Sequence, residues 1–425
     1  MIMKIFKSED YADLEELRSA IGWVFWSEKG PLEEVRKIIN EVEQQGDEAL
    51  YELAMRFDGI DLRKKGFAVS ALDLEGSSRK VSGDFAAAAR AAIRSVTSFH
   101  RSQSWESQFR DSEEGARIGQ MVRPLRRVGI YVPGGGAAYP STAMMTAIPA
   151  KVAGVSEIAV CVPPGSGGEI ATQTLFALHE LGIEEVYRLG GAQAVAAMAL
   201  GTETIPPVDK VVGPGNIYVT LAKKEVFGRV GIDMLAGPTE LVILADKGAD
   251  ADYLAYDMLA QLEHGSGSRV CLITEDPDIV RKVDDKIAAV DAENSVPGIR
   301  DAVAVLVEDL EKGARLVDVM APEHLLITCE DITGVLSCIH NAGAIFLGGD
   351  SPVSIGDYAV GVNHVLPTAG AARYSSPLGV YDFIKRSNVV FSNYKANRAL
   401  CKIVETLAEV EGLLNHAESM RRRLR

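Results

Sequence analysis

Features that would mark a membrane-spanning or exported protein are missing from this 425-residue chain. No uncharged apolar run is long enough to cross a bilayer, and residues 1–10 turn acidic without the apolar core of a signal peptide. We therefore expect no targeting segment, no membrane segment and no membrane partner.

Cysteine is scarce as well. The five cysteines are odd in number and show no CxxC spacing, so they do not predict a disulfide framework. We expect buried thiols in a reducing compartment, which indicates the cytoplasm. These residues are Cys161, Cys271, Cys329, Cys338 and Cys401.

Positive charge is in deficit. Lys and Arg total 44 against 59 Asp and Glu, and the formal charge of -15 has the wrong sign for binding a phosphate backbone. A nucleic-acid partner is therefore not expected. Apolar residues, by contrast, make up 47% of the chain, which is enough to build the cores of two or more domains at this length.

Two kinds of periodicity divide the chain. Residues 30–123 show mainly helical spacing, including a long helix at 83–100 whose His100 is expected to be structural. From residue 127, short apolar runs alternate with helical stretches, which predicts parallel strands joined by right-handed crossovers. The fold class is thus α/β, with two tandem Rossmann-like modules. Strands are expected at 128–132, 157–162, 185–189 and 210–212, and then at 241–245, 270–274, 303–307, 325–328 and 344–347.

Three glycine clusters follow strands of the first series, at 133–136, 190–193 and 213–216. Glycines at the carboxyl end of a strand let backbone amides approach a pyrophosphate, which would indicate a cofactor site. None of the clusters is GxGxxG, and glycine also simply closes tight turns, so both interpretations stay open.

Histidines and carboxylates recur in glycine- and proline-broken segments of the second series. Residues 321–324 (APEH) contain Glu323 and His324, and residues 356–368 contain Asp357 and His364. Such loops at element ends favour acid/base or metal chemistry, although adjacent Glu and His also occur by chance.

A helix expected at 250–264 ends in Gln261 and His264, which lie three residues apart on one face. An amide oxygen, imidazoles and a carboxylate suit a divalent cation such as Zn²⁺. The alternative is ordinary surface polarity.

After residue 383, apolar residues at 400, 403, 407 and 410 predict an amphipathic helix, closely followed by Glu411 and His416. A terminal helix of this kind commonly docks on its own domain.

Taken together, these motifs resemble the histidinol dehydrogenase family along nearly the full length. The resemblance rests on the segments 46–50, 56–58, 132–135, 191–194, 213–216, 236–240, 263–265, 321–324, 356–358, 363–368 and 411–416. Two departures are minor: residues 265–269 lack an acidic residue that many members carry, and Thr239 stands for a serine but keeps the hydroxyl.

The resemblance implies a zinc-dependent, NAD-linked enzyme that oxidises L-histidinol through histidinal to L-histidine. It implies an intertwined homodimer with shared active sites, in which His416 and Glu411 serve the partner's site. The implied zinc ligands are Gln261, His264, Asp357 and His416, and the acid/base pair is Glu323 and His324. The implied substrate contacts add Thr239, His364 and Glu411 to these residues, and the implied NAD contacts are Tyr131, Gln193 and Asn216.

The domain boundaries expected with this resemblance comprise four segments. They are an N-terminal arm 1–29, one α/β domain of 30–127 with 237–383, a second α/β domain on the cofactor side at 128–236, and a C-terminal dimerisation tail 384–425.

The residue types fit this chemistry. Alcohol oxidation needs a base for the hydroxyl proton, and an imidazole such as His324 has an ordinary pKa near ~6.5. Aldehyde oxidation needs activated water, which a carboxylate such as Glu323 can supply. The alternatives are a dehydrogenase of another polar alcohol such as sulfopropanediol, an NAD-independent metallohydrolase, or a noncatalytic paralogue. The last would be expected to have lost one of the two residues.

Overall fold

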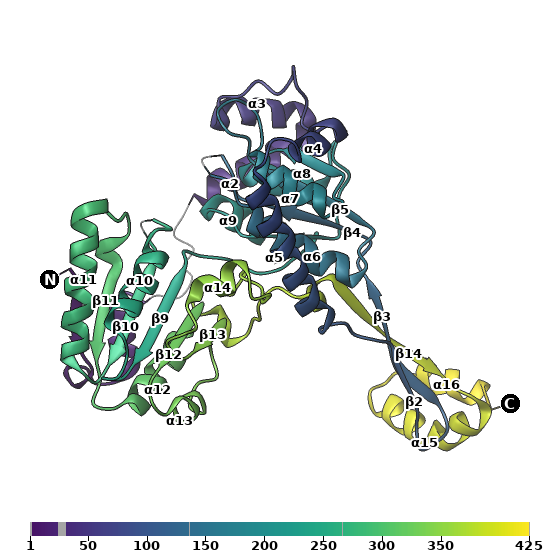
Figure 1. The fold of residues 1–425 in the computed structure, drawn as a ribbon. Coiled ribbons are helices and arrows are strands. Elements are labelled where there is room, and N and C mark those ends of the chain that lie inside the picture. Colours follow the sequence, from purple (N-terminus) through teal and green to yellow (C-terminus); the bar gives the residue numbers. More distant parts are fainter. Residues whose placement is uncertain (1, 24–30, 136, 266, 425) are drawn as a thin grey trace.

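The chain forms two α/β bodies and a projecting arm (Figure 1). The computed structural model describes residues 2–23, 31–135, 137–265 and 267–424. Each body is built on a parallel sheet, and the arm carries the C-terminal helices away from both sheets (Figure 1). The predicted α/β class with two parallel modules is confirmed.

The first body contains a six-stranded parallel sheet in the order β1-β11-β10-β9-β12-β13. Alternate residues of its central strand bury on opposite faces, with Leu241 and Ile243 under α10 and α11, and Val242 and Leu244 under α1 and α12. Both faces are covered, which explains the continuous apolar runs. The bounds are β1 Lys4–Lys7, β9 Glu240–Ala245, β10 Arg269–Thr274, β11 Ala302–Leu306, β12 His324–Thr328, β13 Ala344–Leu347, α1 Leu14–Ala20, α10 Ala251–Leu262, α11 Pro277–Asn294 and α12 Leu310–Met320.

The second body contains a five-stranded parallel sheet in the order β6-β5-β4-β7-β8. Helices α2, α3, α8 and α9 cover one face and α5, α6 and α7 the other. The bounds are β4 Arg127–Tyr131, β5 Glu157–Val162, β6 Glu185–Arg188, β7 Lys210–Val212, β8 Gly231–Ile232, α2 Leu32–Gln45, α3 Asp47–Asp58, α5 Gly83–Arg101, α6 Pro140–Ala153, α7 Thr172–Glu180, α8 Gly191–Leu200 and α9 Ile217–Val226.

The helical N-terminal region packs on this five-stranded sheet. Val35, Ile38 and Leu53 bury against α8, whose alanine-rich surface gives α2 and α3 a close apolar contact. This differs from the expected grouping of residues 30–127 with 237–383. Residues 4–7 of the expected N-terminal arm form β1, which pairs with β11 in the six-stranded sheet. Complementarity between the side chains of distant segments decides both placements. The hydrophobic periodicity within one segment gives no information about that complementarity.

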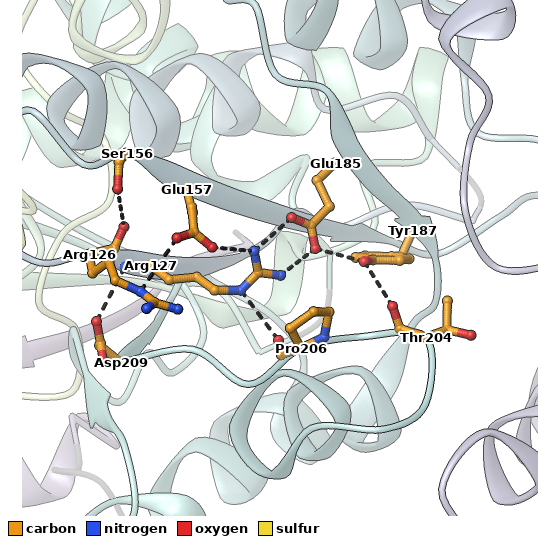
Figure 2. A network of polar contacts seen from close by, with 9 residues as sticks. All are labelled: Arg126, Arg127, Ser156, Glu157, Glu185, Tyr187, Thr204, Pro206 and Asp209. Carbon is orange, nitrogen blue, oxygen red and sulfur yellow. Dashed lines mark hydrogen bonds and ion pairs between the residues drawn. The ribbon is translucent and has the colours of Figure 1, made fainter.

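A polar network joins strands of the five-stranded sheet at their amino ends (Figure 2). The buried Arg127 guanidinium bonds to Glu185 and to Glu157, the latter at 3.2 Å, while the Tyr187 hydroxyl donates to Glu185 at 2.6 Å. A buried cation needs such partners, because an unpaired one would carry a large desolvation cost. The network thus belongs to the sheet's architecture, at the end opposite the glycine clusters.

All nine expected strands are present, with bounds within one residue. The strands that were missed include the antiparallel arm strands β2 (Gln108–Asp111), β3 (Arg117–Pro124) and β14 (Ile384–Phe391). Their side chains are exposed or half-buried, so they lack an apolar pattern.

The arm ends in a helical hairpin of α15 (Tyr394–Val410) and α16 (Leu414–Arg422). Figure 1 shows the hairpin at the far end of the arm, away from both parallel sheets. The apolar face of α15 stays open, with Ile403, Leu407 and Val410 exposed. The tail helix therefore does not dock on its own domain.

All five cysteines are free thiols. Cys161 and Cys271 are buried as expected, whereas the other three are only partly buried. Among the helices of the described ranges, none is long and apolar enough to span a membrane.

Candidate active site

The predicted acid/base residues lie where two neighbouring strands begin. β9 and β12 are parallel neighbours, with His324 beside Leu241, so Thr239 and Glu240 face the residues at the start of β12. Thr239 Oγ1 and Glu240 N donate to Glu323 Oε2 at 2.7 and 2.8 Å. Both Glu323 and His324 are buried. This site is at the amino ends of the strands, where apposed loops converge.

Carboxylates surround the His324 ring on two sides. Its Nδ1 lies 3.6 Å from Glu323 Oε2, and its Nε2 lies 3.8 Å from Asp357 Oδ1. Burial lowers the pKa of His324, but these two carboxylates outweigh it and raise the pKa to about 9. Burial also raises the pKa of Glu323 above its ordinary value, against the opposing effect of His324 and its hydrogen bonds. In the metal-free protein the raised pKa therefore favours the protonated form of His324 at neutral pH.

Three predicted metal ligands belong to helix α10 and the short helix α14 (Val353–Tyr358): Gln261 lies in α10, His264 follows it, and Asp357 lies in α14. Gln261 Nε2 donates to Thr239 Oγ1, which leaves the amide oxygen of Gln261 for another partner. α10 ends at Leu262, so His264 lies in the turn after the helix. Its charge acts on Asp357, whose pKa is raised by burial but lowered overall by His324, His364 and His264.

This donor set fits a cation in part. Gln261, His264 and Asp357 offer an amide oxygen, an imidazole and a carboxylate at or just after the C-terminal ends of two helices, where the backbone favours positive charge. Within the described ranges, however, no group of three or more His, Cys, Asp or Glu side chains is close enough to hold a metal. Glu411 and His416 are exposed on the arm, so a single chain does not bring the fourth predicted ligand to the other three.

His364 is tied to the same cluster. Its Nδ1 lies 2.8 Å from the carbonyl oxygen of Asp357, which can only accept, so the ring presents Nε2 elsewhere. The neighbouring Asn363 donates to Met145 O at 2.7 Å and lies 3.2 Å from His100 Nε2. His100 is buried and holds the loop that carries His364, in agreement with the structural role expected for it.

Sequence reasoning did not single out Glu240. Its backbone contacts both acid/base residues, and its side chain accepts from Ala369 N at 3.2 Å and lies 3.3 Å from Arg269. Burial, and then the charge of Glu323, raises the pKa of Glu240 to about 8. Only its place directly after Thr239 in the 236–240 motif could have indicated it.

A separate cavity of about 370 Å³ lies at the carboxyl ends of the five-stranded sheet, and all three predicted NAD contacts line it. The Tyr131 hydroxyl accepts from Gly191 N at 3.2 Å, and Asn216 caps α9 by accepting from Tyr218 N at 3.1 Å. The glycine clusters form much of the wall. The lining residues are Ile38, Phe57, Asp58, Tyr131, Gly134, Gly135, Pro163, Gly190, Gly191, Ala192, Gln193, Asn216 and Tyr218.

A buried ion pair holds one of these glycine turns. Asp233 Oδ2 accepts from Gly213 N at 2.7 Å, and Lys223 Nζ donates to Gly213 O at 3.0 Å, while the two side chains pair with each other. Gly213 has φ +113°, and a Cβ there would lie 2.1 Å from Tyr131 O. The turn therefore requires glycine, for both strain and space.

Comparisons with known proteins agree along the chain. The sequence profile of the family described as histidinol dehydrogenase matches residues 27–424. Histidinol dehydrogenase of Moorella thermoacetica is 44% identical over 398 residues, covering 92% of this chain and 94% of that protein. The Rhizobium meliloti enzyme is 46% identical over 396 residues, with 92% and 91% covered.

The fold agrees as well. The crystal structure of histidinol dehydrogenase from Elizabethkingia anophelis superposes with a TM-score of 0.93 at 32% identity, covering 100% of this chain and 98% of that one. On these matches, the chain belongs to the histidinol dehydrogenase family.

Proposed function

We propose that this enzyme oxidises L-histidinol through L-histidinal to L-histidine with two NAD and one zinc ion per subunit, as a step of histidine biosynthesis. The observation that carries the proposal is the buried pair Glu323 and His324 beside Gln261 and Asp357. An NAD-independent metallohydrolase, the alternative enzyme class, would not need the separate glycine-lined cavity.

In the first oxidation, the neutral form of His324 takes the proton of the substrate hydroxyl at Nε2, so we expect this step to speed up as the pH rises toward the pKa of about 9 that the ring has in the metal-free site. The ring is held at Nδ1 by the Glu240 carbonyl, so Nε2 has a fixed direction. When NAD is bound, it accepts the hydride that leaves the substrate carbon bearing this hydroxyl.

In the second oxidation, Glu323 activates water for addition to the aldehyde. Glu323 Oε2 is occupied by Thr239 and Glu240, whereas no described residue bonds to Oε1. Oε1 is therefore the atom available to water. A raised pKa makes this carboxylate a stronger base than an exposed one.

Zinc, when bound by Gln261, His264 and Asp357 with His416 of a second copy, would hold the imidazole and amino nitrogens of the substrate and so supply orientation. His364, Thr239 and Glu411 complete the proposed substrate contacts. Tyr131, Gln193 and Asn216 are the proposed NAD contacts, in the cavity that they line.

A homodimer with shared sites is part of the proposal. Its support is the open apolar face of α15 and the exposure of Glu411 and His416 on an arm remote from the other ligands. A second copy would cover that face and complete both sites.

The direct test is NADH formation by the purified protein from L-histidinol, with and without a chelator. We expect two NADH per histidinol, loss of activity after chelation, and recovery with Zn²⁺. Sulfopropanediol serves as the contrasting substrate, and faster turnover of it than of histidinol would overturn the substrate assignment. Substrate conversion without NAD would favour the hydrolase.

A further inference from the structure

One carboxylate in the glycine-lined cavity has no role so far. Asp58 is the last residue of α3 and lies on the cavity wall. Among the described residues that line this cavity it is the only one with a charged side chain. Within the described lining, a ligand that fills the cavity therefore meets one negative charge.

The position of Asp58 is unfavourable for the stability of the fold. It is half-buried, and burial alone raises the pKa of its carboxyl group. No hydrogen bond or ion pair from any described residue reaches the carboxylate. An acidic side chain in the last turn also opposes the helix dipole. A charge that the fold does not compensate is a candidate for ligand contact.

Nearby cations do not neutralise it. Arg56 lies 3.4 Å from Glu41, and Arg63 pairs with Glu48. The phenol of Tyr131, which lines the same cavity, has its pKa raised to about 12 by burial and, to a small extent, by Asp58, so it stays a neutral hydroxyl. The ionised Asp58 can only accept hydrogen bonds, and its partner must be a donor.

The cavity wall indicates which part of a dinucleotide lies near Asp58. Gly190, Gly191 and Gln193 surround the start of α8, whose first-turn amides favour a phosphate group. Ile38 and Phe57 line the same cavity as Asp58 and offer apolar side chains for contact with a flat base. Figure 1 shows α3 on the side of the five-stranded body away from β9 and β12, which carry the acid/base pair. The reactive ring must approach that pair, so the adenosine half lies toward α3.

We infer that Asp58 accepts hydrogen bonds from the adenosine ribose hydroxyls of the dinucleotide and excludes dinucleotides that carry a 2′-phosphate. The inference rests on the proposed function, which places NAD in this cavity. A carboxylate binds a vicinal diol well, and it repels a phosphate at the same position.

The test compares binding of ADP-ribose and 2′-phospho-ADP-ribose by calorimetry, without alcohol substrate and without turnover. We expect the wild-type protein to bind ADP-ribose at least ~10-fold more tightly. Asp58→Asn should bring the ratio of the two dissociation constants near one. It should do so mainly by weakening the binding of ADP-ribose and strengthening the binding of 2′-phospho-ADP-ribose. Asp61→Asn is the matched control, because it removes the same charge from an exposed residue outside the cavity lining.

Thermal melting separates ligand contact from a structural role. Asp58→Asn should melt at the wild-type temperature or higher, since it removes an uncompensated charge. A lower melting temperature, together with an equal loss of affinity for both ligands, would overturn the inference. An unchanged ratio with normal NAD binding would also overturn it while leaving the proposed function intact. Absence of any NAD or ADP-ribose binding by the wild-type protein would overturn both.

Discussion

The backbone carbonyl oxygen of Glu240 lies 3.0 Å from Nδ1 of His324. Because a carbonyl only accepts, the neutral ring carries its proton on Nδ1 and its lone pair on Nε2. A contact from the neighbouring strand therefore selects the tautomer in which Nε2, near Asp357, can act as a base. The same residue holds Glu323 through its amide, so one peptide unit orients both members of the pair.

This electrostatic arrangement can be tested in the metal-free protein. The pKa of His324 should lie well above 6.5, near 9, and Glu323→Gln should lower it, because a nearby charge is lost while burial persists. Protonated His324 then stabilises the metal-free fold below about pH 6.5, and that contribution should disappear as the pH rises through about 9. Histidine NMR measures the titration. Glu293→Gln, an exposed change, is the control, and an equal shift in both variants would contradict the assignment.

The two half-reactions should respond differently to changes in the pair. Glu323→Gln should slow histidinal oxidation by about 10²–10⁴-fold, because that step needs activated water. Its effect on histidinol oxidation, measured in a single turnover with the aldehyde trapped, should be much smaller. His324→Asn should show the reverse order. Equal losses in both steps for both variants would refute this division of roles.

His264→Asn should lose bound zinc and activity together while the protein remains folded. The loss of affinity should exceed the roughly 10–100-fold that changes beyond the direct ligands cost. Metal analysis after dialysis, with circular dichroism for the fold, gives the result. His340→Asn replaces an exposed histidine that lies near Asp318, outside the site, and should keep its zinc. Full occupancy in the His264 variant would remove that residue from the ligand set.

Co-refolding of two inactive variants tests the shared site. If His416 serves the partner, mixing His324→Asn with His416→Asn should return roughly a quarter of wild-type activity, because half of the random dimers are mixed and each has one intact site. Mixing His324→Asn with His264→Asn, two lesions in the same body, should return none. Demonstrably mixed dimers without recovery in the first pair would rule out the shared site.

Gly213 should be far less replaceable than Gly228. Both have positive φ, +113° and +101°, but a Cβ at Gly213 meets Tyr131 O at 2.1 Å, and one at Gly228 meets nothing within 4 Å. Gly228→Ala should cost about 1–3 kcal/mol from backbone strain alone. Gly213→Ala should lower the melting temperature further and weaken NAD binding. Equal effects of the two variants on both measurements would show that the turn is not under this steric constraint.

The sequence alone determined the parallel sheets. Strands such as β9 and β10 are buried on both faces, so their apolar runs are continuous and their ends are marked by polar or glycine residues. Glu323 and His324 stood out for a similar local reason, since a Glu-His pair in a proline-broken loop is visible without knowing what lies across from it.

Only the tertiary structure decided which segments meet. Strand β14 pairs with β3 over Ile384–Phe391 although more than 250 residues separate them, and neither strand has a buried face that would leave a pattern in the sequence. The roles of Glu240 and Asp58 likewise depend on strand register and on the packing of α3 against a distant sheet. Such long-range contacts arise from complementarity between surfaces, and the residues on one surface do not specify the other.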